Sequence, residues 1–218
     1  MINTPFTGHN AMQIWGRLSS INVRKVVWAA QETGVPFSRT DAGAAFGIVG
    51  TPQYRQLNPN ALVPTLQDGD LTLWESNVIV RYLATKYPAA ALLPADIGRR
   101  FIAEQWMDWQ QTTFSRAGRD AFMQLIRTPA AQRNDVLIAQ SVEATVPLLQ
   151  RLDQHLAEHR HMAGDDFSMA DIPLGCEMHR WFGLPLAHDL AALPHLHRWF
   201  DGLRARPASR GVLDQALT

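Results

Sequence analysis

The spacing of apolar residues changes near Pro88 of this 218-residue chain, and this change limits the architecture most. Before Pro88, short apolar runs alternate with segments of helical periodicity, which is typical of strands and helices in turn. After it, apolar residues recur at helical spacing only. We therefore expect an α/β domain over residues 11–88 and an all-helical domain over 96–210, joined by a segment rich in proline and alanine.

The first domain is predicted to contain a mixed four-stranded sheet. The predicted strands are 12–15, 37–40, 63–67 and 71–74. The first two enclose a helix that ends at Gly34, and this strand–helix–strand order gives parallel pairing. Asp68-Gly69 predicts a hairpin turn between the last two strands. Thr51 and Ser76 are predicted to cap two further helices.

The second domain is predicted to be a bundle of helices. One helix has a face of residues spaced three and four apart, formed by Ile102, Trp106, Trp109 and Thr113. Ser168 and Asp171 stand three residues apart before an apolar run, which is typical of a capping box at a helix start. No run in this half has the alternation of a strand.

Composition excludes several classes of protein. Twenty basic and twenty acidic residues give a formal net charge of +0, which argues against nucleic-acid and polybasic membrane binding. The one cysteine, Cys176, excludes an internal disulfide and a cysteine-rich zinc site. His155, His159 and His161 fit a solvated helix end better than a metal site, so we predict no metal. No secretory signal or apolar run of about 20 residues is present, so we expect a soluble cytoplasmic protein.

Three short segments of the first domain suggest a binding site. In the first, hydroxyl and amide side chains of Ser19, Ser20 and Asn22 precede or open a helix. Backbone N–H groups converge at a helix N-terminus, so such a loop stabilises an anion. The alternative is an ordinary helix cap.

The second segment is Leu62-Val63-Pro64 at the start of a strand. Because proline cannot donate to a strand ladder, it is restricted to an edge, a first position or a cis turn. A cis Pro64 would expose the backbone of Val63 to pair with an extended ligand.

The third segment is Glu75-Ser76, after a strand and at a helix start. Ser76 and nearby N–H groups suit a carboxylate, and Glu75 suits an ammonium group. Together they fit the α-amino acid end of a peptide. The alternative is a cap beside an acidic first turn.

Taken together, these segments resemble the glutathione transferase family. The resemblance rests on IWGRLSSINVRKVVWAAQETGVPF, LNPNALVPTL, LWESNVIVRYLATKYP and FSMADIPLG, and covers roughly residues 12–207. It implies a thioredoxin-like first domain, a helical second domain, glutathione as cosubstrate, a cytoplasmic homodimer and a small-molecule electrophile as the other substrate.

The resemblance also assigns residues. It places the group that meets the glutathione sulfur at Ser20, ranked before Asn22 and then Ser19. It places the backbone contacts to glutathione at Val63 and Pro64. It assigns binding of the γ-glutamyl end to Glu75 and Ser76. Tyrosine-type and cysteine-type members are excluded because this loop contains neither residue, and Leu62 replaces a basic or amide side chain found in many relatives.

The predicted chemistry is activation of the glutathione thiolate for attack on an electrophile, with glutathione-dependent disulfide reduction as a variant. We expect the acceptor to lie against the face of Trp106, Trp109 and Thr113, although such a stripe is also typical of a core. The alternative function is a non-catalytic glutathione-transferase-like binding or assembly module.

Overall fold

The computed structural model describes residues 12–186 and 192–218. The strands are β1 (Met12–Trp15), β2 (Phe37–Thr40), β3 (Thr65–Asp68) and β4 (Leu71–Trp74). The helices are α1 (Ile21–Thr33), α2 (Pro52–Leu57), α3 (Ser76–Lys86), α4 (Ile97–Trp109), α5 (Ser115–Phe122), α6 (Asp135–Glu158), α7 (Asp171–Phe182) and α8 (Pro194–Arg204). None of the helices in this described part is long and apolar enough to cross a bilayer.

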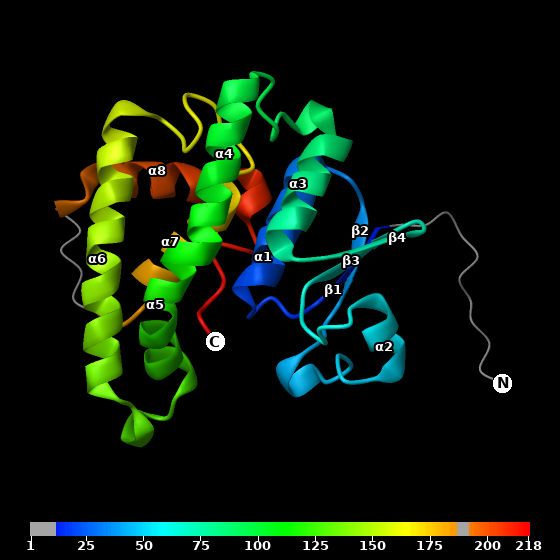
Figure 1. Cartoon of the computed structure of the whole chain (residues 1–218), viewed down its shortest axis with the longest axis horizontal. Helices are drawn as coiled ribbons and strands as arrows, with labels where there is room; N and C mark the ends of the chain where they lie inside the picture. Colours follow the sequence, from blue (N-terminus) through cyan, green and yellow to red (C-terminus); the bar gives the residue numbers. More distant parts are fainter. Residues whose placement is uncertain (1–11, 187–191) are drawn as a thin grey trace.

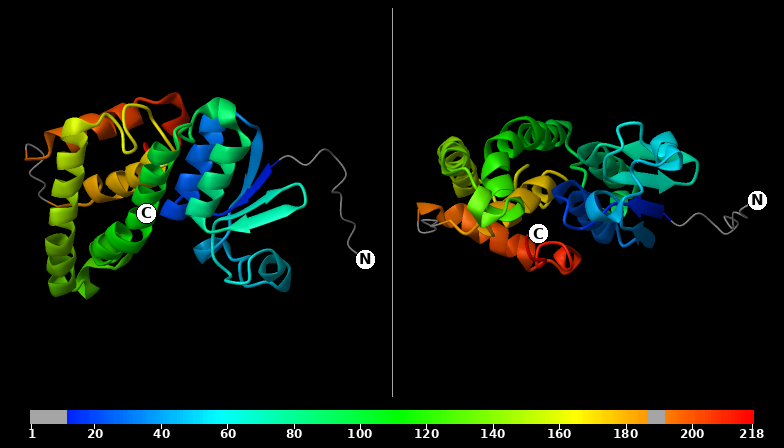
Figure 2. Two further views of the ribbon diagram at one scale, coloured as in Figure 1. Left: turned by 45° about the horizontal axis from the view of Figure 1, so that its top comes forward. Right: turned by 90° about the horizontal axis from the view of Figure 1, so that it is seen from below.

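The four strands form one mixed sheet in the order β2-β1-β3-β4. β1 pairs with β2 in parallel, and the other two pairs are antiparallel. Helices α1 and α3 lie between this sheet and the helical half of the molecule (Figures 1 and 2). The predicted thioredoxin-like sheet domain and helical domain are confirmed.

The hairpin differs from the prediction at both of its ends. β3 begins at Thr65, two residues later than expected, because Pro64 has no N–H to donate and the Val63-Pro64 peptide is cis. Asp68 belongs to β3, where it pairs with Leu71. The two turn residues are therefore Gly69, with φ of +62°, and Asp70.

Local cap signals were correct at two helices and wrong at a third. Thr51 Oγ1 accepts the N–H of Tyr54 at 3.2 Å, and Gly34 ends α1 in a left-handed conformation. Ser76, however, is the first residue of α3 and not its cap. Glu75 holds the cap position, and its side chain makes no capping hydrogen bond.

In the described part of the second half, all regular secondary structure is helical, apart from one isolated bridge between His161 and Gly164. Two wider π-helical turns, Gln110–Phe114 and Met123–Arg127, connect α4 to α5 and extend α5. The sequence pattern did not predict them. Such turns are often found at functional sites.

Asp171 opens α7 and is fully buried. Its Oδ2 accepts the N–H of Ser168 at 2.9 Å, as the acidic residue of a capping box does, although Ala170 and not the predicted Ser168 holds the N-cap position of α7. Its Oδ1 accepts from the indole Nε1 of Trp199 at 2.8 Å and from the N–H of Met162 at 3.0 Å. One carboxylate therefore joins α7, α8 and the loop before α7.

Helix α1 is packed on all sides, and residues 23–30 are all buried. It contacts α3 in its own domain and α7 in the helical domain. The close approach of α7 depends on Gly175, where a Cβ atom would lie 2.7 Å from Leu203 Cδ1 and 2.8 Å from Trp28 Cζ3. A side chain there would have to displace Trp28 and Leu203.

We predict that Gly175→Ala lowers the free energy of unfolding by about 1–3 kcal/mol, because the added methyl overlaps Trp28 and Leu203. Gly202→Ala in α8 is the matched control. A Cβ there meets no atom within 4 Å, and the helix propensity of alanine favours it. Urea denaturation of both variants measures the difference; equal stabilities would contradict the packing argument.

Candidate active site

One cleft of about 60 Å³ is lined by residues from each of the three predicted segments. Asn22 comes from the first turn of α1, Leu62, Val63 and Pro64 from the loop before β3, and Glu75 and Ser76 from the start of α3. Asn58, Asn60 and Trp74 complete its lining. Segments more than fifty residues apart in the sequence thus line one cleft, whereas Ser19 and Ser20 are not part of its lining.

Ser20 is at the N-cap position of α1, but its side chain does not cap the helix. Its carbonyl oxygen accepts the N–H groups of Val23 and Arg24 at 3.1 and 3.0 Å, while the hydroxyl makes no capping hydrogen bond. Ser20 therefore holds the cap position without a side-chain capping bond. A half-buried hydroxyl is left beside the positive end of a helix.

The other two loop residues extend in different directions. Asn22 Oδ1 accepts a hydrogen bond from Ser76 Oγ at 3.2 Å, which links α1 to α3. Ser19 faces the helical domain, and its carbonyl oxygen accepts from Arg127 Nη2 at 3.1 Å. Of the three candidates, Ser20 is the one that occupies the N-cap position and whose carbonyl oxygen accepts the first N–H groups of α1.

The loop before β3 is held by two side chains that the sequence analysis missed. The predicted cis peptide at Val63-Pro64 is present. The carbonyl oxygen of Leu62 accepts from Tyr54 Oη at 2.7 Å and from Asn58 Nδ2 at 3.0 Å. Both side chains are buried, and burial raises the pKa of Tyr54, so its hydroxyl stays protonated. Their spacing of four residues at the end of α2 was the signal available in the sequence.

Glu75 has an unusual backbone. Its φ of +70° lies in a region that costs a residue with a side chain of order 1–3 kcal/mol. This turn directs the chain from β4 into α3 and leaves the Glu75 carboxylate exposed on the cleft. Because Glu75 does not cap α3, the first N–H groups of the helix remain available to an anion.

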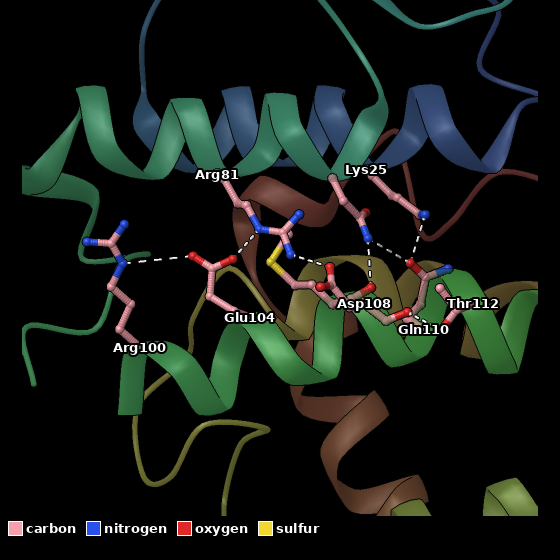
Figure 3. A network of polar contacts seen from close by, with 9 residues as sticks. Lys25, Arg81, Arg100, Glu104, Asp108, Gln110 and Thr112 are labelled. Carbon is pink, nitrogen blue, oxygen red and sulfur yellow. Dashed lines mark hydrogen bonds and ion pairs between the residues drawn. The ribbon is translucent and has the colours of Figure 1, made fainter. Parts of the chain in front are cut away.

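A buried polar network anchors this end of α3 to the helical domain (Figure 3). Asn77 Nδ2 donates to Met107 O at 2.8 Å and to Gln110 Oε1 at 3.2 Å. Lys25 Nζ donates to the same Gln110 oxygen at 2.9 Å, and Gln110 Nε2 donates to Glu177 at 2.8 Å. Burial lowers the pKa of Lys25 to about 8, although the charge of Glu177 opposes the shift.

A second set of ion pairs joins α3 to α4 in the same figure. Arg81 of α3 pairs with both Glu104 and Asp108 of α4, and Arg100 Nε lies 3.8 Å from Glu104. The contacts of Arg81 hold the middle of α3 against α4. They add to the buried network in fixing the first domain to the helical domain.

The three predicted acceptor residues differ in burial. Trp106 is buried, with its ring 5.2 Å from that of Trp109 and 4.8 Å from that of His155. Trp109 also packs against Phe114, and Thr113 is exposed. The stripe thus contributes to the core of the helical domain. Its role toward an acceptor stays a prediction.

A smaller hollow lies on the other side of the first turn of α1. It is lined by Ser19, Ile21, Arg24, Phe122, Cys176, His179, Arg180, Leu217 and Thr218. Burial raises the pKa of the Cys176 thiol to about 12, so this residue is not a thiolate at neutral pH. The described residues include no cluster of side chains suited to a metal ion.

Comparison with known proteins agrees with this geometry. The family model of the glutathione S-transferase N-terminal domain matches residues 10–85, and that of the C-terminal domain matches residues 117–207. The chain therefore belongs to the glutathione S-transferase family. Membership of this family confirms the expected transferase that uses glutathione as cosubstrate, and nothing in the comparisons favours a non-catalytic role.

Individual relatives cover nearly the whole chain. Glutathione S-transferase GstB of Escherichia coli strain K12 is 40% identical over 92% of this chain and 96% of its own length. The theta class glutathione S-transferase of Xanthomonas axonopodis pv. citri, solved with glutathione bound, is 47% identical, with a TM-score of 0.91 over 95% of this chain and 99% of that one. Glutathione S-transferase 4 of Zea mays is 28% identical over 92–93% of both chains.

We predict a pH-dependent stability that depends on His179. Burial, and next the charge of Arg24, lower the pKa of His179 to about 4, because Arg24 Nη1 donates to His179 Nδ1 at 2.8 Å. The unfolded state binds this proton near pH 6.5, so stability is complete above that pH and falls as the pH drops toward 4. The expected loss is roughly 2–3 kcal/mol.

His179→Gln removes the titrating group but keeps an acceptor for Arg24. Denaturant unfolding between pH 7 and pH 4 compares the two proteins, and the difference isolates this histidine from the carboxylates that titrate in the same range. If the free energy of unfolding changes with pH in the same way in the wild type and the variant, His179 does not contribute to the pH dependence.

Proposed function

We propose that this chain binds glutathione in the cleft between α1, the cis-proline loop and α3, and activates its thiol at Ser20. The γ-glutamyl end lies at Glu75 and Ser76, and the peptide backbone pairs with Val63. The observation that carries the proposal is the hydroxyl of Ser20, which does not cap α1 although it occupies the N-cap position. The cleft supports the proposal, because Val63, Glu75 and Ser76 all line it.

The role of Ser20 is to stabilise the thiolate form of glutathione. A free cysteine thiol has a pKa near 8.5, and the thiolate is the nucleophile. Lowering that pKa by one to two units requires about 1.4–2.7 kcal/mol. One hydrogen bond to a charged group and the positive end of α1 supply this amount. Ser20 acts as a donor and forms no covalent bond.

The thiolate then attacks a small-molecule electrophile. A carbon–sulfur bond forms, and the leaving group departs with the electron pair of its bond. The same thiolate attacks a disulfide sulfur in the related reaction, which releases a thiolate and leaves a mixed disulfide with glutathione. Both reactions need only glutathione and the acceptor, and the thiol proton passes to solvent when glutathione binds.

We predict that Ser20→Ala lowers kcat/KM for a chloroarene acceptor by about 100-fold, because an alanine donates no hydrogen bond to the thiolate. The affinity for glutathione, measured by calorimetry, is expected to change much less than kcat/KM. The ultraviolet absorbance of the bound thiolate, followed against pH, reports a raised thiol pKa in the variant.

Ser19→Ala is the matched control, since its contact to Arg127 is made by the backbone carbonyl. Its activity is expected to stay close to that of the wild type. An undiminished rate in Ser20→Ala would move the assignment to Asn22 or Ser19. No affinity for glutathione at millimolar concentration would refute the proposed function as a whole.

The active form is a homodimer in the cytoplasm. Large apolar side chains are exposed on the two helices that meet beside the cleft: Val78 of α3 is 44% exposed, and Ile97 and Phe101 of α4 are each 64% exposed. A second copy would cover them. The cytoplasm keeps glutathione reduced, and the free Cys176 is compatible with that environment.

We predict that Phe101→Glu weakens the dimer, because it places a charge in an apolar contact. Val136→Glu on α6 is the control, since Val136 is exposed to the same 64% but lies on another helix. Sedimentation velocity is expected to show dimers for the wild type and the control and monomers for Phe101→Glu. A monomeric wild type would contradict the proposal.

A further inference from the structure

Guanidinium groups gather where the β1–α1 loop meets the helical domain. Arg127 donates to the carbonyl oxygen of Ser19, the neighbour of Ser20. Arg127 and Arg180 stack on the ring of Phe122, with guanidinium carbons 5.6 and 4.1 Å from its centre. Arg180 also lines the small hollow that Ser19 lines. These contacts place positive charge on the helical side of the thiol loop.

Arg17, in the same loop, adds a third charge. Burial, then the charge of Arg17 and then that of Arg180, lower the pKa of Arg127, which shows that the three groups lie near one another. Arg17 Nε is buried and has no hydrogen-bond partner among the described residues. Within that part of the chain none of the three forms an ion pair with a carboxylate, whereas Arg119 on α5 pairs with Asp120.

The position of this arginine cluster (Arg17, Arg127 and Arg180) relative to the cleft is informative. Asn22 and Ser76 border the cleft on one side of the first turn of α1, and Ser19 and Ile21 border the hollow on the other. Ser20 stands between these two borders in the sequence, so a thiolate held there has the cleft on one side and the hollow with Arg180 on the other. With glutathione in the cleft, we expect the acceptor to approach from the side of the hollow.

We propose that the arginine cluster selects electrophiles that carry a carboxylate next to the reacting carbon. The inference rests on the proposed function, because it assumes that the thiolate forms at Ser20. Guanidinium groups bind carboxylates by paired, charge-assisted hydrogen bonds, so neighbouring like charges gain from an anionic ligand. The charge of Glu177 acts on Arg180 and raises its pKa against the effect of burial. A purely apolar acceptor would leave Arg17 and Arg127 without an anionic partner.

Iodoacetate is the simplest probe of this class. The glutathione sulfur forms a bond to its methylene carbon, the carbon–iodine bond breaks, and iodide leaves with the electron pair. The thiol proton has already passed to solvent. The product is carboxymethyl-glutathione, and no oxidant or metal takes part. The buried Cys176, with its pKa of about 12, does not compete for the reagent.

The test compares iodoacetate with iodoacetamide, which has the same methylene carbon and leaving group but no charge. Both rates are corrected for the uncatalysed reaction. Arg127→Gln and Arg180→Gln are each expected to lower kcat/KM for iodoacetate about tenfold or more, and to change that for iodoacetamide less than about twofold. Arg127→Lys and Arg180→Lys keep the charge and are expected to retain part of the iodoacetate rate.

Arg119→Gln is the matched control, because it removes the same charge from α5 at a residue that already has a partner. It is expected to leave both rates unchanged. Equal losses with both reagents in the glutamine variants would overturn the inference, since the arginines would then act on the thiolate or the loop. Activity of the wild type with both reagents, but no selective loss in any variant, would overturn it too.

The failure of the proposed function has a different signature. In that case the unaltered chain accelerates neither reaction and does not bind glutathione, and this inference falls with it. Retained iodoacetamide activity in the glutamine variants also shows that they are folded. The selective loss of the iodoacetate rate is therefore the result that supports an anion-binding acceptor side.

Discussion

The burial of α1 between two domains is the constraint on which the rest of the structure depends. Residues 23–30 of this helix are all buried, so the sheet domain and the helical domain share one apolar core. The apolar residues of this stretch lie on more than one face of the helix, so both domains are needed to cover it. Its N-terminus, and with it Ser20, is consequently fixed at the line where the two domains meet.

The same burial forces two cations into the interior, and the structure compensates each one differently. Lys25 donates to Gln110, whose amide donates to Glu177, so its charge is balanced across the domain boundary. Arg24 donates to the carbonyl oxygens of Leu18 and Ala216. Each arrangement replaces water with several partners, as a buried charge requires. Apolar packing alone would leave the relative position of the two domains less specific. These polar contacts therefore fix that position.

Sequence reasoning succeeded where the cause is local. Gly34 and Thr51 end and begin helices through their own conformation and hydrogen bonding, and both were predicted. It failed where the cause is distant. The positive φ of Glu75 is imposed by the junction of β4 and α3, although Glu has no preference for it. Trp106 meets His155 because α4 lies beside α6, and no spacing within α4 contains that information.

The contact between Gly175 and Trp28 limits how such proteins can be recombined. The linker near Pro88 looks like a natural point at which to exchange the helical half for that of a relative. The indole of Trp28, however, requires a residue without a side chain on the incoming α7, and Lys25 requires an acceptor where Gln110 stands. A chimera joined at the linker takes one residue of each pair from one parent and the other residue from the second parent. A working hybrid must therefore take α1 from the same parent as the helices that pack against it.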